Sequence, residues 1–242
     1  MSGHSKWSTI KRKKGALDAQ RGKIFTKMAK MITVAARQGG GDPQMNIKLR
    51  LAVDKARQVN MPAQSIERAI KKGTGDLQEG VALEELTYEA YGPGGAALII
   101  EAVSDNKNRT TSEIKHILAD NGGRLGETGS VKWLFDKIGV VRINSFKKEE
   151  RENIELAIID AGANDLKDEE GSLLVLSDIE KLSEIKKCLE DNNILYDSAE
   201  PELIPKNPLK INDKNILSQL EKLMEALDGQ EDVNEIYSNL SQ

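Results

Sequence analysis

The chain has 242 residues, of which 38% are hydrophobic and 31% are charged, a composition that supports two or three compact units with real cores. No run approaches the roughly 18 uninterrupted apolar residues of a membrane-spanning helix, and the first thirty residues lack the apolar core of an export signal. The single cysteine, Cys188, excludes an internal disulfide framework, and with two histidines a structural zinc site is disfavoured. We therefore expect a cytoplasmic protein with no metal, no other cofactor and no membrane partner.

The net charge of −4 combines two oppositely charged parts of the chain. Residues 1–75 hold 17 Lys and Arg against 4 acidic residues, which gives +13, whereas the other 167 residues hold 18 against 35, which gives −17. This asymmetry is typical of a polyanion-binding segment joined to an acidic body. The alternative is two solvated surfaces that attract one another. The binding interpretation is favoured because charge this dense repels itself within a compact domain.

The basic part, residues 1–78, begins with a polar tail and continues with three predicted amphipathic helices. The first helix has one apolar stripe, formed by Ile24, Met28, Met31, Ile32 and Ala35. At 100° per residue, four cations fall within an arc of roughly 80° beside that stripe: Lys23, Lys27, Lys30 and Arg37. One face of this helix is therefore expected to pack while its neighbour presents a row of positive charge.

Glycine and proline mark the ends of these helices. Gly39-Gly40-Gly41 is expected to end the first, and Asp42-Pro43 to supply the N-cap and first-turn proline of the second. Met61-Pro62 separates the second helix from a short third one, which is expected to end at Lys72-Gly73.

Residues 79–138 and 207–242 are expected to form one discontinuous α+β domain. Residues 86–91 alternate as in a half-buried strand, and the apolar run 96–103 predicts a central strand. A helix is expected to follow with Thr110 and Glu113 as a capping box, and then a strand at 131–138. The helix after Pro208 is expected to complete this domain.

Residues 139–206 have the predicted order βαββαβ, which is the ferredoxin-like arrangement. Pro201, Pro205 and Pro208 are expected to form a stiff exit from it. The predicted fold class is α+β, with an N-terminal three-helix domain followed by two α+β domains, the ferredoxin-like one inserted in the other.

Several motifs in order resemble the YebC/PmpR family along the chain to about residue 140, and more weakly after Pro208. They are Gly3-His4-Ser5-Lys6-Trp7, Arg21-Gly22-Lys23-Ile24-Phe25, Ala35-Ala36-Arg37, Gly39-Gly40-Gly41-Asp42-Pro43, Asn60-Met61-Pro62, Tyr91-Gly92-Pro93-Gly94-Gly95, Asp105 to Thr110 and Gly129-Ser130-Val131. Lys107 stands where arginine is frequent in that family, and Ser8 where alanine is. The resemblance implies a helical domain followed by two α+β domains and a cytoplasmic regulator of gene expression. Family members are described as DNA-binding transcriptional regulators, and some relatives, including mitochondrial ones, as translation activators at the ribosome.

The candidate nucleic-acid contacts are mostly cations of the basic part, because Lys and Arg bind phosphate without reading sequence. They are His4, Lys6, Trp7, Lys11, Arg12, Lys13, Lys14, Arg21, Lys23, Lys27, Lys30, Arg37 and Arg109. Trp7 is a candidate for stacking on an unpaired base or for packing on the helices. Arg109 closes the polar loop from Asp105, which is suited to anion contact or simply to a tight turn.

The leading functional hypothesis is a non-enzymatic transcriptional regulator that binds DNA through its basic helical domain. Ribosomal RNA would satisfy the same cations, so a translation factor at the ribosome is the alternative. No catalytic residues are assigned, and a metal-dependent nuclease using Glu101 and Asp105 is a remote alternative. The acidic body is a candidate surface for a protein partner or an internal imitation of nucleic acid.

Overall fold

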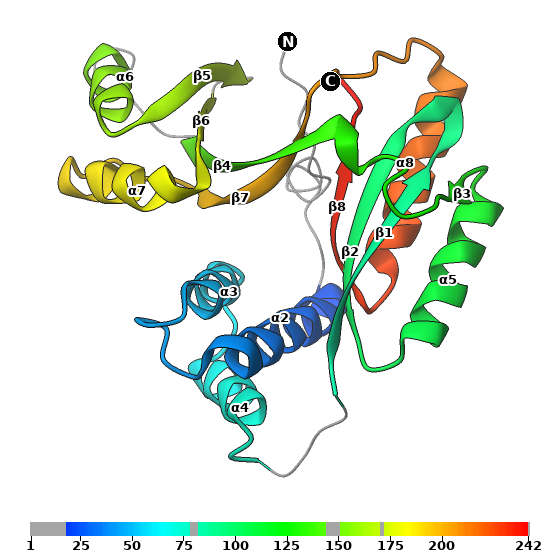
Figure 1. The fold of residues 1–242 in the computed structure, drawn as a ribbon, viewed down its shortest axis with the longest axis horizontal. Helices are drawn as coiled ribbons and strands as arrows, with labels where there is room; N and C mark the ends of the chain where they lie inside the picture. Colours follow the sequence, from blue (N-terminus) through cyan, green and yellow to red (C-terminus); the bar gives the residue numbers. More distant parts are fainter. Residues whose placement is uncertain (1–17, 78–81, 144–150, 170–171, 242) are drawn as a thin grey trace. The chain divides into compact units, whose positions relative to one another are not determined.

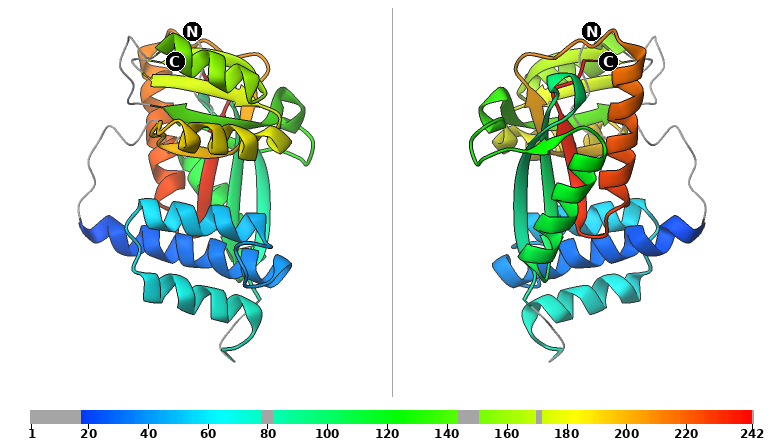
Figure 2. Two further views of the ribbon diagram at one scale, coloured as in Figure 1. Left: turned by 90° about the vertical axis from the view of Figure 1, so that its left-hand side faces the viewer. Right: turned by 90° about the vertical axis from the view of Figure 1, so that its right-hand side faces the viewer.

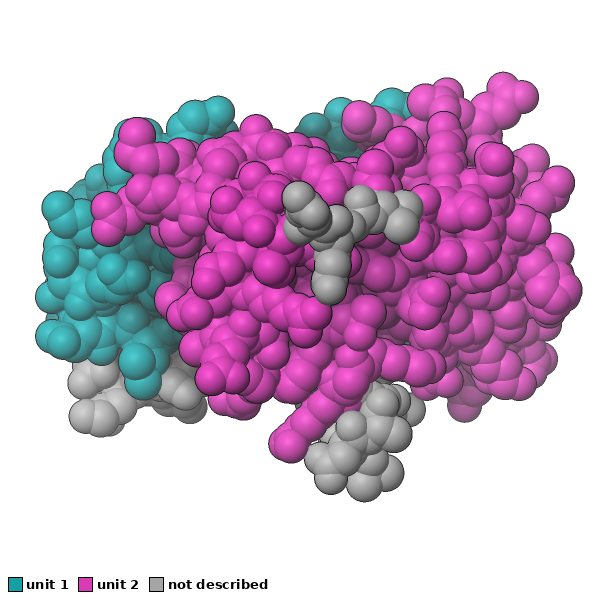
Figure 3. Space-filling view, turned by 90° about the horizontal axis from the view of Figure 1, so that it is seen from below, with its two compact units in different colours: residues 1–6, 133–211, 237–242 teal, residues 7–132, 212–236 magenta. Residues whose placement is uncertain are grey.

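The computed structural model describes residues 18–77, 82–143, 151–169 and 172–241 (Figure 1). Within these residues the chain divides into two compact units, coloured separately in Figure 3. One unit comprises residues 18–132 and 212–236, and the other comprises 133–211 and 237–241. No helix in the described part of the chain is long and apolar enough to cross a membrane.

Three helices open the first unit, α2 (Asp18–Gly39), α3 (Ile47–Gln58) and α4 (Ala63–Thr74). They run side by side with α2 between the other two (Figure 2). The predicted apolar stripe of α2 faces this bundle, because Ile32 and Ala35 are buried and Met28 and Met31 pack against the same cluster. The predicted helices are therefore confirmed.

The start of α3 differs from the expectation. Asn46, rather than Asp42, is its N-cap, and the Asn46 side-chain oxygen accepts the Leu49 N–H at 3.0 Å. The amide nitrogen of Asn46 donates to the carbonyls of Ala35 and Gly40, each at 2.8 Å. Asn46 thus satisfies free backbone groups at the end of one helix and the start of the next.

The close crossing of α2 and α4 requires a glycine at residue 73. A Cβ placed on Gly73 would lie 2.4 Å from the Thr33 carbonyl oxygen and 2.6 Å from the Ala36 Cβ. Any side chain there would push the two helices apart. The α4 helix continues past the predicted stop at this glycine to Thr74, and Gly75 follows as a left-handed C-cap.

A four-stranded sheet with strand order β3-β1-β2-β8 completes this unit. Strands β1 (Glu84–Tyr91) and β2 (Ala97–Ser104) form an antiparallel hairpin around the short 3-10 turn η1 (Pro93–Gly95). Strand β3 (Arg124–Leu125) pairs with β1.

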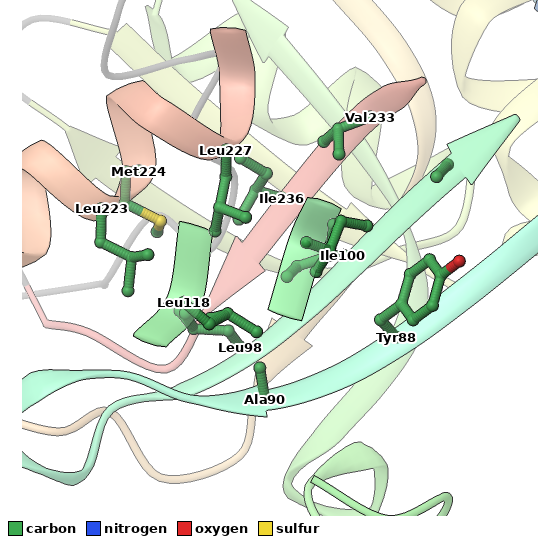
Figure 4. Packing of buried hydrophobic residues seen from close by; sticks show 12 residues of the cluster. Tyr88, Ala90, Leu98, Ile100, Leu118, Leu223, Met224, Leu227, Val233 and Ile236 are labelled. Atoms are coloured by element: carbon green, nitrogen blue, oxygen red, sulfur yellow. The ribbon is translucent and has the colours of Figure 1, made fainter. Parts of the chain in front are cut away.

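Helices α5 (Lys107–Asp120) and α8 (Lys214–Gly229) cover the sheet with apolar side chains. Leu118 from α5 and Leu223, Met224 and Leu227 from α8 meet Ile100 of β2 in one buried cluster (Figure 4). The helix expected after Pro208 is therefore present and packs on this sheet.

Two details of this sheet were not anticipated. Strand β8 (Val233–Ser238) was not predicted, because its short sequence mixes polar and apolar residues without clear alternation. The N-cap of α5 is Asn106, whose side chain accepts the Arg109 N–H at 3.1 Å. The predicted capping role of Thr110 was wrong, since Thr110 lies inside the helix and is fully buried.

The second unit contains a four-stranded antiparallel sheet with strand order β5-β6-β4-β7. Its elements in chain order are η2 (Lys132–Leu134), β4 (Phe135–Ile143), α6 (Arg151–Asp160), β5 (Ala163–Glu169), β6 (Ser172–Ser177), η4 (Ile179–Lys181), α7 (Leu182–Asp191) and β7 (Ser198–Pro205). From β4 onward the order is βαββαβ with the first strand central, which is the ferredoxin-like topology. The α+β fold class, with its ferredoxin-like part, is confirmed.

Two expectations at the edges of this sheet were wrong. The separate strand at 131–138 does not form. Residues 135–138 are instead the first part of β4, where they pair with residues 202–205 of β7. Pro201 and Pro205 lie inside β7 rather than in an exit segment. The exact domain boundaries 1–78, 79–138 with 207–242, and 139–206 stay a prediction.

Candidate nucleic-acid interface

The predicted contacts in the tail lie outside the described residues. These are His4, Lys6, Trp7, Lys11, Arg12, Lys13 and Lys14. The remaining predicted contacts, five cations of α2 and Arg109, are described, and the structure separates them into two groups.

Three of the five cations on α2 are exposed to solvent. Arg21 and Lys23 lie in the first part of the helix, and Arg37 lies in its last turn. A cation near a helix C-terminus is also favoured by the helix dipole, so Arg37 is compatible with the helix as well as with an anionic ligand.

The other two cations of α2 contact acidic residues about 200 positions later in the chain. The Lys27 ammonium donates to the Asp228 carbonyl oxygen at 2.6 Å and lies 3.9 Å from the Asp228 carboxylate. The Lys30 ammonium lies 2.6 Å from a carboxylate oxygen of Asp232. Two lysines predicted to contact phosphate therefore contact carboxylate and carbonyl groups of the same chain instead.

Asp232 is the centre of a buried polar network, and its side chain is 0% exposed. Besides Lys30, its carboxylate receives a hydrogen bond from the Thr110 hydroxyl at 2.7 Å and from the Arg109 guanidinium at 2.9 Å. Its own backbone N–H donates to the Gln230 side-chain oxygen at 2.6 Å. The donors to the carboxylate come from α2 and α5, and Asp232 itself lies in the turn before β8, so this carboxylate joins three parts of the fold.

The ionisation of Asp232 follows from this environment. Burial alone would raise its pKa, but hydrogen bonds from Lys30, Thr110 and Arg109 outweigh burial and hold the pKa of Asp232 well below its usual range. The carboxylate is therefore charged at neutral pH despite being inaccessible to solvent.

Two lysines of α3 make the same kind of contact. The Lys55 ammonium lies 3.0 Å from the Glu235 carboxylate of β8, which is 9% exposed. The Lys48 ammonium lies 2.6 Å from the Glu85 carboxylate of β1, where both side chains are about half exposed. We call Lys27, Lys30, Lys48 and Lys55, with their partners Asp228, Asp232, Glu85 and Glu235, the lysine seam.

Arg109 belongs to the buried polar network around Asp232. Its guanidinium lies 2.9 Å from both Asp105 and Asp232. The hydrogen bond and charge of Asp232 raise the pKa of Arg109. The side chain is nevertheless 37% exposed, so one side of this guanidinium still reaches solvent.

The predicted contacts did not include the exposed cations of α3 and α4. Arg57 of α3 and Arg68 and Lys71 of α4 are all exposed. The signal that could have found them is helical position, because each falls outside the apolar stripe of its helix. We call Arg21, Lys23, Arg37, Arg57, Arg68 and Lys71 the exposed cations.

A buried glutamate organises the loop that carries Gly129-Ser130-Val131. The Glu89 carboxylate of β1 accepts backbone N–H groups of Gly129, Val131 and Lys132 at 2.6, 2.7 and 2.8 Å. Burial would raise the pKa of Glu89, but these three donors lower it. This motif thus has a structural explanation in the packing of its own loop.

The chemistry available to the exposed cations is the binding of phosphate. Phosphate groups are bound by Lys and Arg through charge, and by Arg also in a bidentate manner. Asp105, a residue of the nuclease alternative, is paired with Arg109. Among the residues that the structure describes, no group of three or more His, Cys, Asp or Glu side chains is placed to hold a metal ion.

Comparison with family models matches nearly the whole chain. The TACO1/YebC protein N-terminal domain matches residues 5–76, and the TACO1/YebC second and third domain matches residues 83–240. The first match coincides with the basic part of the chain, and the second with the two sheets and their helices.

Individual relatives agree with these models. A probable transcriptional regulatory protein of Halothermothrix orenii is 49% identical over 241 residues, covering 99% of this chain and 94% of the relative. One of the same description from Desulfosudis oleivorans is also 49% identical, covering 100% and 97%. The crystal structure of a conserved hypothetical protein from Aquifex aeolicus has a TM-score of 0.86 and 39% identity, over 97% of this chain and 96% of that one.

Proposed function

The chain belongs to the TACO1/YebC family, and on this premise we propose that it is a cytoplasmic, non-enzymatic regulator of transcription that binds DNA through its basic helical domain. The relatives named as probable transcriptional regulatory proteins support the regulatory part of this proposal. The observation that carries the DNA-binding part is the set of exposed cations on a packed helical scaffold.

The scaffold matters because it fixes the positions of the charges. The buried cluster of α2, α3 and α4 holds the three helices together, so the exposed cations keep a defined spacing. Preorganised charges lose less conformational freedom on binding than charges on a flexible chain. Regularly spaced phosphates of a duplex are a ligand that such a surface suits.

The proposed contacts follow from where each cation lies. Arg21, Lys23 and Arg37 contact phosphate directly, together with the predicted tail residues His4, Lys6, Lys11, Arg12, Lys13 and Lys14. Trp7 of the tail stacks on an unpaired base. Lys27 and Lys30 reach phosphate only if Asp228 and Asp232 release them, and Arg109 does so through its solvent-facing side. Phosphate contacts position the protein and carry no sequence information directly.

Charge reversal in the tail tests the binding site. Replacing Lys11, Arg12, Lys13 and Lys14 with Glu should weaken binding to a 30-base-pair DNA duplex, measured by fluorescence anisotropy across a salt series. The matched control reverses four exposed lysines elsewhere, Lys115, Lys187, Lys210 and Lys222. Equal loss of affinity in both variants would mean that net charge alone drives binding.

Crosslinking in cells tests the identity of the nucleic acid. If the protein regulates transcription on DNA, crosslinked fragments contain chromosomal DNA enriched at particular loci. Recovery of ribosomal RNA without such DNA would reject the DNA proposal and favour action at the ribosome.

A further inference from the structure

The loop between α2 and α3, residues 40–46, is held by several local hydrogen bonds. Asn46 bonds to the carbonyls of Ala35 and Gly40 and caps α3, as described above. The Asp42 carboxylate accepts the Gln44 N–H at 2.8 Å, and the Asp42 carbonyl accepts the N–H groups of Met45 and Asn46. The backbone on either side of Met45 is therefore fixed.

This fixed loop presents two large apolar side chains to solvent. Met45 is 83% exposed, and Ile47, the first residue of α3, is 62% exposed. The other exposed large apolar side chain described in the helical part, Val59, is only 37% exposed. Single exposed apolar residues are common on protein surfaces, but these two flank a buried, hydrogen-bonded asparagine, so the backbone that carries them is fixed.

The loop follows the last turn of α2 and contacts the last turn of α4, and each of these turns carries an exposed cation. Gly41 approaches the ends of Ile70 and Thr74, because a Cβ there would lie 3.2 and 2.7 Å from their methyl groups. The last turns of α2 and α4 meet at Gly73, where a Cβ would lie 3.2 Å from the backbone nitrogen of Arg37. These turns carry the exposed Arg37 and Lys71.

We infer that Met45 and Ile47 form an apolar wedge that contacts base faces at an unstacked step of DNA, while Arg37 and Lys71 contact the neighbouring phosphates. This inference rests on the proposed function. Apolar side chains of this size insert between base steps in DNA-bending proteins, where the cost of unstacking is offset by additional contacts. The exposed Arg37 and Lys71 on the adjoining helix turns favour a polyanion over an apolar protein surface as the occupant.

The wedge predicts a preference for DNA that is already partly unstacked. An unpaired step costs less to open, so a duplex with a central two-nucleotide mismatch should bind more tightly than the fully paired duplex with the same flanks. The variant Met45→Ser/Ile47→Ser should lose roughly three- to tenfold in affinity for the mismatched duplex and keep its affinity for the paired one. Its salt dependence should not change, because no phosphate-binding cation is removed.

Leu195→Ser is the matched control, because Leu195 is 77% exposed and lies outside the helical part. It should bind both duplexes as the unmodified protein does. Urea unfolding of each variant checks that the fold is intact. An intact fold is expected, because Met45, Ile47 and Leu195 are all exposed.

The outcomes separate the inference from the proposed function. If the unmodified protein binds DNA and the Met45→Ser/Ile47→Ser variant binds both duplexes as tightly as the parent, the wedge is wrong and the proposed function stands. If the variant loses affinity for both duplexes to the same extent, the two side chains do not read unstacking and the wedge is again wrong. If the unmodified protein binds neither duplex but binds an RNA hairpin with an open loop, DNA is not the ligand and both proposals fall.

Discussion

The lysine seam and the exposed cations differ in their surroundings although α2 and α3 carry members of both. Lys23, Lys27, Lys30 and Arg37 share one arc of α2, and Lys27 and Lys30 in the middle contact acidic residues while Lys23 and Arg37 are exposed. The helix alone does not distinguish them. What distinguishes them is whether an acidic residue from the end of α8 or the turn after it reaches that part of the helix.

The ion pairs of the lysine seam differ in the burial of their acidic partners, and their contributions to stability should differ accordingly. Asp232 is 0% exposed and accepts several hydrogen bonds, whereas Glu85 is 42% exposed. Removing one partner from a buried ion pair leaves an uncompensated charge, which is costly, while an exposed pair contributes little. Mutations along the seam should therefore have very different effects on stability.

The largest effect is expected for Asp232→Asn. This change removes the charge that Lys30 and Arg109 face and should lower the free energy of unfolding by about 2 to 4 kcal/mol. Urea unfolding followed by circular dichroism measures it. Asp105→Asn is the control, since Asp105 also pairs with Arg109 but is 38% exposed, and a loss under about 1 kcal/mol is expected there. Equal losses in the two variants would contradict the central role of Asp232.

Acid should remove the same contribution in the unmodified protein. Because the pKa of Asp232 is lowered in the folded state, its contribution is present above its unfolded pKa of roughly 4 and is lost as the pH falls toward the folded pKa. The difference in stability between the parent and Asp232→Asn should narrow by about 1.4 kcal/mol per pH unit below that value. Urea midpoints at pH 7, 5, 4 and 3 check this, and a constant difference would show that Asp232 does not titrate as described.

The smallest effect is expected at the exposed end of the seam. Glu85→Gln removes the pair with Lys48, in which both side chains are about half exposed, and should change stability by less than about 0.5 kcal/mol. Added salt should reduce even this difference, because exposed pairs are screened. A loss of stability comparable with that of Asp232→Asn would mean that burial of the acidic partner does not determine how much each ion pair of the lysine seam contributes.

The fold was predictable from the sequence where periodicity and turn residues agree. The apolar stripe of α2 and the order βαββαβ were both predicted correctly. Strand β8 was missed because six residues carry little periodicity, and its place beside β2 depends on a chain segment about 130 residues away in sequence. Local patterns do not encode such pairing.

For the candidate site, the sequence predicted where the cations lie along the chain but not which of them have acidic partners. Counting residues located the cations, but Lys27 and Lys30 have partners 201 and 202 positions away, which no local pattern indicates. Asn46 shows the same limit at short range, because Asp42-Pro43 has a stronger capping pattern and yet the buried amide at residue 46 caps α3. Partners of buried polar groups follow from packing, not from spacing.

The salt dependence of DNA binding by two variants tests the account most directly. The first neutralises three exposed cations, Lys23→Gln, Arg37→Gln and Lys71→Gln, and the second neutralises three exposed lysines of the other segments, Lys115, Lys187 and Lys222. If the exposed cations bind phosphate, the slope of log affinity against log salt becomes shallower by about 0.9 for each phosphate that is no longer neutralised, or by nearly 3 in the first variant, and does not change in the second. An unchanged slope in the first variant would show that the helical surface does not bind the nucleic-acid backbone.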